Sequence, residues 1–319
     1  MRMRSYGIRV ALIGVIALPL VACNSLERLR ALRVVRDAHT EYQRGAYEEA
    51  ARLYTEVLAN DPDMVDVYFY LGNSYDQLYR PSREGEPEND MLLEQAIDNY
   101  ITAVDRQPNP ILRTLAMQYL VAAFGPDKAN SPGKSEPVLQ RLIEEDPENP
   151  ETYFQLAKLY EDSGLYADAE KVLLQVRGMR PDDPAVHMQL AGFYDRNDNF
   201  DKTIESLRAR AQIESDNPEA FYTLGTFYWQ KAFRDFRLND EEEMEYVMLG
   251  LEEVEKALAL NEDYVEALTY KNILLRMQAN LTEDLDEREA LIAEADELRD
   301  RAEELIELRR SGGAPAAAS

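Results

Sequence analysis

Three copies of one short sequence pattern recur in the middle of the chain, and successive copies are 34 residues apart. Each copy begins with a leucine, at Leu156, Leu190 and Leu224. A small residue follows the leucine directly, a tyrosine stands four positions after it, and a ring-bearing residue stands three positions before it. A period of this length is typical of stacked helical hairpins, because one hairpin alone cannot bury its apolar face. The pattern therefore predicts an all-α solenoid, whose usual function is to hold other molecules.

The charge of the chain narrows the kinds of partner. Its 319 residues include 61 acidic and 35 basic side chains, and the formal net charge is -26. A surface of this sign repels phosphate and lacks the basic stripe that nucleic-acid binding requires, so we expect no nucleic-acid partner. Two alternatives remain for the acidic surface, which is either simply hydrated or attracts a basic partner.

The first 23 residues have the organisation of an export signal. Three arginines lie within the first nine residues, and an apolar stretch over residues 10–22 follows them. This stretch is too short to span a bilayer as a stable helix, and the combination is typical of a secretory signal peptide. Its end, Leu20-Val21-Ala22-Cys23, resembles the lipobox of bacterial lipoproteins. The alternative is an ordinary signal peptide followed by a stray thiol.

The lipobox resemblance implies acylation of Cys23 and cleavage of the chain before it. Residues 1–22 are then the lipoprotein signal peptide and residues 23–30 a tether to the membrane. Asn24 stands where an aspartate retains proteobacterial lipoproteins in the inner membrane. We therefore expect a bacterial envelope protein that is anchored in the outer membrane and faces the periplasm.

Beyond residue 30, the chain resembles the tetratricopeptide repeat. In that family the first helix carries a large residue, a leucine, a glycine or alanine and a tyrosine. The second helix carries an alanine and further apolar positions, and a proline closes the repeat. One repeat is nearly complete, with Tyr153, Leu156, Ala157, Tyr160, Gly164, Tyr166, Ala169, Leu173, Val176 and Pro181. The resemblance implies a right-handed superhelix of about six to seven helix–turn–helix repeats.

The expected solenoid extends over residues 31–310, and we expect a disordered tail at residues 311–319. The repeats are expected at residues 31–64, 65–108, 109–149, 150–183, 184–217, 218–263 and 264–310. Inserts rich in proline, glycine and polar residues interrupt the second and third repeats near residues 80–91 and 124–136. Pairs such as Asn149-Pro150 and Asp183-Pro184 are expected to end one helix and cap the next. We expect small residues such as Gly72 and Gly225 to allow close helix contacts, and tyrosines to fill the seams between repeats.

The sequence predicts no enzyme, cofactor or metal site. Four residues alternate like the start of a calcium loop, namely Asp195, Asn197, Asn199 and Asp201. However, Phe200 and Ser206 stand where an EF-hand requires glycine and glutamate, so we expect a turn between two helices. The two histidines, His39 and His187, lack a cysteine or a patterned second histidine as companion, which argues against zinc. There is neither a glycine-rich phosphate loop nor a Gly-x-Ser-x-Gly nucleophile motif.

The family resemblance also implies a concave binding groove, lined by the first helix of each repeat. The matching positions are Phe69, Asn73 and Asp76; Phe154, Lys158 and Glu161; Met188, Gly192 and Asp195; and Tyr222, Thr226 and Trp229. Aromatic anchors and selective charges are typical of protein-binding surfaces. The carboxylates would repel the C-terminal carboxylate that the chaperone-binding subclass clamps, so we expect an extended or helical segment with apolar and basic residues. The alternative is that Phe69, Phe154 and Tyr222 pack against the long C-terminal helix or against one another.

Three functions are compatible with these features. The favoured one is a lipid-anchored scaffold for protein–protein interactions in a bacterial envelope complex. In architecture it resembles the lipoproteins of outer-membrane protein assembly and the pilotins of type IV pili. An adaptor or regulator of a periplasmic cell-wall enzyme, without catalytic activity of its own, is the alternative. A structural element that self-associates through its edges is the third.

Overall fold

The structure is a computed structural model that describes residues 31–311, and throughout this range the regular secondary structure is helical. The predicted all-α class is therefore confirmed. The signal peptide, Cys23, the tether and residues 312–319 lie outside the described residues. No helix in the described range is long and apolar enough to cross a membrane. The chain divides into two compact units, one ending at Gly164 and one beginning at Leu165.

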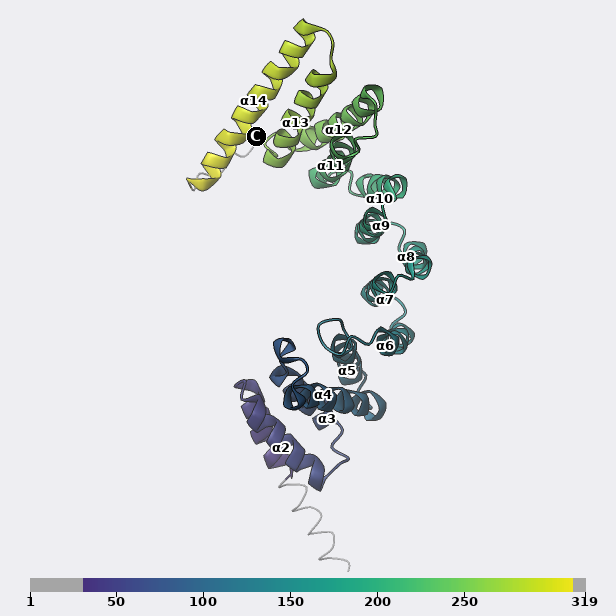
Figure 1. The fold of residues 1–319 in the computed structure, drawn as a ribbon. Coiled ribbons are helices and arrows are strands. Elements are labelled where there is room, and N and C mark those ends of the chain that lie inside the picture. Colours follow the sequence, from purple (N-terminus) through teal and green to yellow (C-terminus); the bar gives the residue numbers. More distant parts are fainter. Residues whose placement is uncertain (1–30, 312–319) are drawn as a thin grey trace, which may run out of the picture. The chain divides into compact units, whose positions relative to one another are not determined.

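Unit 1 is a series of helices joined by short turns (Figure 1). A helix over residues 31–43 comes first and is followed by α2 (Tyr47–Asn60) and α3 (Asp66–Leu78). A 3-10 turn at Pro81–Arg83 then leads to α4 (Pro87–Arg106). The unit ends with α5 (Pro110–Ala123), α6 (Pro132–Glu145) and α7 (Pro150–Asp162).

Unit 2 continues the pattern of consecutive helix pairs. It contains α8 (Tyr166–Met179), α9 (Pro184–Arg196), α10 (Phe200–Ile213) and α11 (Pro218–Arg234). They are followed by α12 (Asp240–Leu260), α13 (Val265–Leu281) and α14 (Leu285–Arg310). Helix α11 packs directly against α12, and α13 packs directly against α14. This order of helix–turn–helix pairs is the one that the sequence period predicts.

The helix starts follow the local chemistry that the sequence indicates. Four helices begin with a proline, and an asparagine or aspartate directly precedes each proline. The side chain of this asparagine or aspartate accepts a hydrogen bond from a backbone N–H of the first turn. The capping residues are Asn109, Asn149, Asp183 and Asn217, and their N···O distances are 3.0–3.1 Å. Proline suits the first helical position because its missing N–H would have no partner there. The predicted helix boundaries at Pro150 and Pro184 are confirmed, since α7 and α9 begin at these residues.

The repeated leucine, small residue and tyrosine form the core. Leu156, Leu190 and Leu224 are buried, and so are Tyr194 and Tyr228. Tyr160 is half-buried, and its hydroxyl donates to Glu136 over 2.8 Å. The Tyr194 hydroxyl donates to Glu170 over the same distance. The tyrosines therefore fill the seam between consecutive helices, and the preceding helix supplies an acceptor for the phenol.

Each insert contains a connection between two helices and the start of the second helix. Helix α4 already begins at Pro87 and α6 at Pro132, so residues 87–91 and 132–136 are helical. The reason is that proline suits the first position of a helix, where its fixed φ angle fits and its missing N–H would have no partner. The acidic run at residues 240–243 likewise lies in the first turn of α12, where Asn239 and Glu242 form a capping box.

Candidate protein-binding site

In unit 1, the predicted groove residues of α3 are buried by their neighbours. The Phe69 ring contacts the rings of Tyr100 and Tyr119, with centroids 6.1 and 5.5 Å away. The Asn73 side chain accepts a hydrogen bond from the Tyr42 hydroxyl over 2.6 Å and donates to Tyr100 over 3.3 Å. Phe69 is therefore buried, but α4 and α5 cover it rather than the packing partners that the alternative names.

The carboxylate of Asp76 closes this network. Its Oδ2 accepts a hydrogen bond from the Tyr100 hydroxyl over 3.3 Å, and its Oδ1 forms an ion pair with Lys128. Lys128 lies in the connection between α5 and α6, which is the second insert. Burial, reinforced by the charge of Asp76, raises the pKa of Tyr100 far above its usual range. The phenol thus stays a neutral donor, and the insert supplies the cation that Asp76 needs.

The predicted positions on α7 and α9 are more open. Phe154 and Glu161 are half-buried, and Lys158 is exposed and forms an ion pair with Asp162 one turn later. In unit 2, Met188 and Asp195 are exposed on α9. Gly192 and Thr226 are half-buried. Apart from Gly192, which has no side chain, these residues leave side-chain surface that a partner can reach.

Five aromatic residues form a continuous ladder in unit 2: three lie on α11, one lies on α13, and Tyr264 directly precedes α13. Tyr222 contacts the rings of Tyr264 and Tyr270, with centroids 5.3 and 5.4 Å away. Trp229 contacts Tyr270 at 5.1 Å and stacks on Phe233 at 5.4 Å. Phe233 is 65% exposed, so the ladder reaches solvent at this end. We call these five residues the aromatic ladder.

The ladder is uncharged and held by packing. Burial raises the pKa of Tyr222 to about 12, so its hydroxyl stays protonated at neutral pH. The Trp229 Nε1 is buried and finds no hydrogen-bond acceptor among the described residues, so ring contacts position the indole. Large, rigid aromatic rings of this kind are typical anchors of protein–protein interfaces, since they bury much area at little entropic cost.

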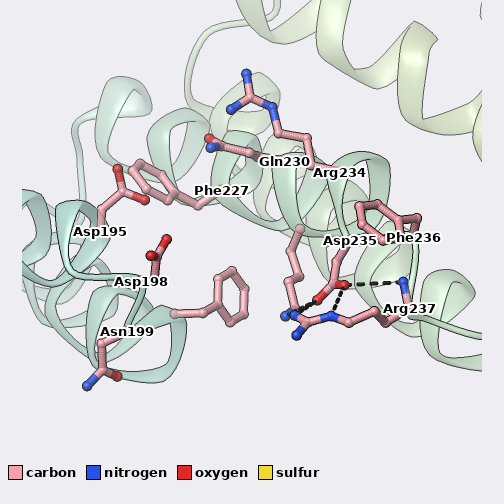
Figure 2. A pocket seen from close by; sticks show the side chains of 11 residues that line it. Asp195, Asp198, Asn199, Phe227, Gln230, Arg234, Asp235, Phe236 and Arg237 are labelled. Atoms are coloured by element: carbon pink, nitrogen blue, oxygen red, sulfur yellow. Dashed lines mark hydrogen bonds and ion pairs between the residues drawn. The ribbon is translucent and has the colours of Figure 1, made fainter.

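A second feature of unit 2 is a pocket beside the C-terminal half of α11. Its volume is about 600 Å³. Figure 2 shows the carboxylates of Asp195 and Asp198 on one side of the pocket. The charged side chains of Arg234, Asp235 and Arg237 lie on the other side. Its lining residues are Asp195, Asp198, Asn199, Phe200, Phe227, Gln230, Lys231, Arg234, Asp235, Phe236 and Arg237.

Sequence reasoning located part of this surface and missed the rest. Tyr222, Trp229 and Asp195 were predicted from the repeat alignment. Tyr264, Tyr270, Phe233 and most of the pocket were not, because they lie outside the aligned groove positions. The available signal was the stretch after Trp229, which has no proline or glycine and contains Phe233, and which continues past the point where α7 and α9 end in their repeats.

Metal chemistry finds no support in this surface. In residues 31–311, no group of three or more histidine, cysteine or acidic side chains is arranged to hold a metal ion. His187 instead uses its Nε2 in a 2.6 Å contact with the Pro181 carbonyl, as a packed residue of α9. Asn199, from the calcium-like run, caps α10 by accepting from the Lys202 N–H.

Comparisons with known proteins agree with the fold. Residues 38–78 match a model described as TPR repeat, and residues 128–193 match one described as tetratricopeptide repeat. The chain is similar to the C-terminal part of a TPR repeat-containing protein from Cytophaga hutchinsonii, with 14% identity over 86% of this chain and 98% of that chain. The TM-score of 0.54 shows a shared fold.

Two further solved structures are similar at lower scores. A tetratricopeptide repeat protein from Parabacteroides merdae has 12% identity over 83% of this chain and 98% of that chain, with a TM-score of 0.45. MamA from Desulfovibrio magneticus has 17% identity over 63% of this chain and 97% of that chain, with a TM-score of 0.38. A comparison with curated proteins found no match.

Proposed function

We propose that this chain, a tetratricopeptide-repeat protein and a scaffold for protein–protein interaction, works as a lipid-anchored scaffold in a bacterial envelope complex. Its role is to position a partner polypeptide rather than to catalyse a reaction. The observation that carries the proposal is the aromatic ladder, which ends at the exposed ring of Phe233. Exposed aromatic surface next to charged residues is characteristic of interaction sites.

The partner is an extended or helical segment with apolar and basic side chains. Apolar residues suit the ladder, because its rings offer area and an uncharged surface. Basic residues suit the rest of the protein, whose formal net charge is -26. Within unit 2, groove residues Met188 and Asp195 contribute further contacts, while Phe69, Asn73 and Asp76 support the fold of unit 1.

The proposed anchor is the acylated Cys23, and the proposed location is the outer membrane with the repeats in the periplasm. Support comes from the lipobox residues 20–23 and from Asn24. Several acyl chains, at about 0.8 kcal/mol for each buried CH₂ group, make such an anchor effectively permanent. Exchange of Cys23→Ser is then expected to release the protein from the membrane fraction.

The test uses a photoreactive amino acid in place of Phe233, in the full chain and in intact cells. We expect one partner protein to be crosslinked in membranes, and mass spectrometry identifies it. The matched control carries the same group at Leu285, which is 68% exposed and lies outside the ladder. Addition of the purified partner should then change the fluorescence of Trp229, the only tryptophan. Equal crosslinking at both positions, or unchanged fluorescence, would reject the ladder as the binding site.

A further inference from the structure

The pocket of unit 2 exists because α11 is longer than the first helices of the two preceding repeats. Helices α7 and α9 have 13 residues each, and α11 has 17. Its additional turn, together with residues 235–237, forms one wall of the pocket. The opposite wall is the end of α9 and the turn that leads into α10 (Figure 2). The pocket is therefore a property of this chain's extended helix, not of the repeat pattern.

The α9 side of the pocket is acidic and firmly held. Asp195 and Asp198 both line it, and among the described residues the structure records no ion pair for either carboxylate. Backbone hydrogen bonds fix the turn, from Asp198 N to Asp195 O over 3.1 Å and from Asn199 N to Tyr194 O over 2.9 Å. Two unpaired carboxylates on a short turn attract a cation through their negative charge. Because backbone hydrogen bonds already fix the turn, little conformational entropy is lost when the cation binds.

The α11 side of the pocket keeps a positive charge. The Asp235 carboxylate accepts hydrogen bonds from Arg237 over 2.7 Å and from Lys231 over 2.8 Å, so one anion serves two cations. These bonds, with that of Arg237 the stronger, hold the pKa of Asp235 well below its usual range. Arg234 lines the same side, and its guanidinium forms no ion pair with an acidic side chain of the described residues. This wall therefore favours an anion.

Phenylalanine rings lie between and beside the two charged walls. Phe200 and Phe227 line the pocket, and the Lys231 ammonium lies 5.2 Å from the Phe200 ring centroid. Phe236 is 97% exposed at the edge. A ring so open to solvent is poorly suited to enclosing a small molecule, but a passing polypeptide can cover it.

We infer that this pocket binds a short segment of a partner polypeptide in which an aromatic or long apolar side chain stands between a basic and an acidic residue. The basic residue pairs with Asp195 and Asp198, and the acidic residue faces Arg234 and Arg237. The apolar side chain packs against the phenylalanine rings. This inference deepens the proposed function and rests on it, since it specifies the partner's chemistry and adds an acidic residue to the expected motif.

The experiment measures the binding of four capped, fluorescein-labelled heptapeptides to the full chain by anisotropy. The parent is Gly-Lys-Gly-Phe-Gly-Glu-Gly, the second exchanges its Lys and Glu, the third has Gln for Glu, and the fourth has Gln at both positions. One of the two doubly charged peptides should bind about tenfold or more tightly than the uncharged one, and 500 mM salt should remove the difference. Equal affinities, or no binding by any peptide at millimolar concentration, would overturn the inference.

Variants locate the site. The double exchange Asp195→Asn with Asp198→Asn should abolish the contribution of the peptide lysine, Arg234→Gln that of its glutamate, and Phe236→Ala should weaken all four peptides. The matched controls are Asp201→Asn, an exposed aspartate that does not line the pocket, and Leu285→Ala. Unchanged binding in the double variant would also overturn the inference.

The crosslinking at position 233 separates this inference from the proposed function. Suppose that a partner is crosslinked at position 233, but the peptides do not bind or bind equally well to the pocket variants. The proposed scaffold function then stands, and the inference about the pocket is rejected. If the peptides bind as expected but no partner is crosslinked in membranes, the inference stands and the envelope scaffold falls.

Discussion

At Gly225 the contact between α11 and α12 leaves no space for a side chain. A Cβ atom there would lie 2.7 Å from Val254 Cγ2 and 3.2 Å from the Gly250 carbonyl oxygen. We expect Gly225→Ala to lower the free energy of unfolding by about 1–3 kcal/mol, because overpacking forces the two helices apart. Urea denaturation measures this loss.

The control for Gly225 is Gly178→Ala in α8, where nothing lies within 4 Å of the added Cβ atom. This exchange should leave stability unchanged or raise it by about 0.4–1 kcal/mol. Equal losses at both positions would mean that helix approach is not the reason for glycine at 225.

His39 is a residue whose surroundings should be visible in its titration. Its Nδ1 lies 2.6 Å from the Tyr54 hydroxyl, and its ring lies 4.5 Å from that of Tyr70. Burial lowers the pKa of His39 below its ordinary value of 6.5, although the Asp66 carboxylate opposes this. The stability that neutral His39 contributes is therefore present above pH 6.5 and is lost as the pH falls from there through the folded pKa.

An NMR titration of the imidazole ring tests this. We expect His39 to titrate below 6.5 in the folded protein and near that value in urea. Asp66→Asn should lower the folded pKa further, because it removes the one raising charge. A folded pKa at or above 6.5 would contradict the burial of this ring.

Among the elements, the connection of residues 124–131 acts as part of the core of unit 1. The Asp76 side chain is 4% exposed and the Lys128 side chain 25%. We expect Lys128→Ala to cost about 1–3 kcal/mol of unfolding free energy, because it leaves a buried carboxylate without its cation. The double exchange of Lys128→Met with Asp76→Asn should recover most of the loss, since it removes both charges.

Lys158→Ala is the matched control for that element. Lys158 pairs with Asp162 on the surface of α7, where the two side chains are 57% and 55% exposed. Solvent screens such a pair, and we expect a loss below about 0.5 kcal/mol. Comparable losses at Lys128 and Lys158, from urea titrations, would show that the insert does not stabilise the core.

At the scale of the whole molecule, the acidic excess should govern association. With a formal net charge of -26, long-range attraction accelerates the encounter with a basic partner segment. We expect the association rate constant to fall about tenfold or more between 50 and 500 mM salt, as screening shortens this attraction. Stopped-flow measurement of Trp229 fluorescence reports the rate. A rate independent of salt would favour the merely hydrated surface.

The sequence alone determined the helical hairpins of this protein. The period of 34 residues, the buried leucines and the Asn-Pro and Asp-Pro caps act between residues that are near one another in the chain, so they can be recognised without coordinates. The same reasoning placed Tyr222, Trp229 and Asp195 on a binding surface, and these predictions await the experiments above.

Only the tertiary structure decided which of these side chains stay accessible. Lys128 reaches Asp76 across 52 positions of sequence, and that contact turns a predicted groove residue into a buried one. Tyr264 and Tyr270 join Tyr222 because α13 packs close to α11. The pocket appears because α11 extends further than α7 and α9. Exposure depends on contacts between distant helices and on their lengths, and a local repeat pattern specifies neither.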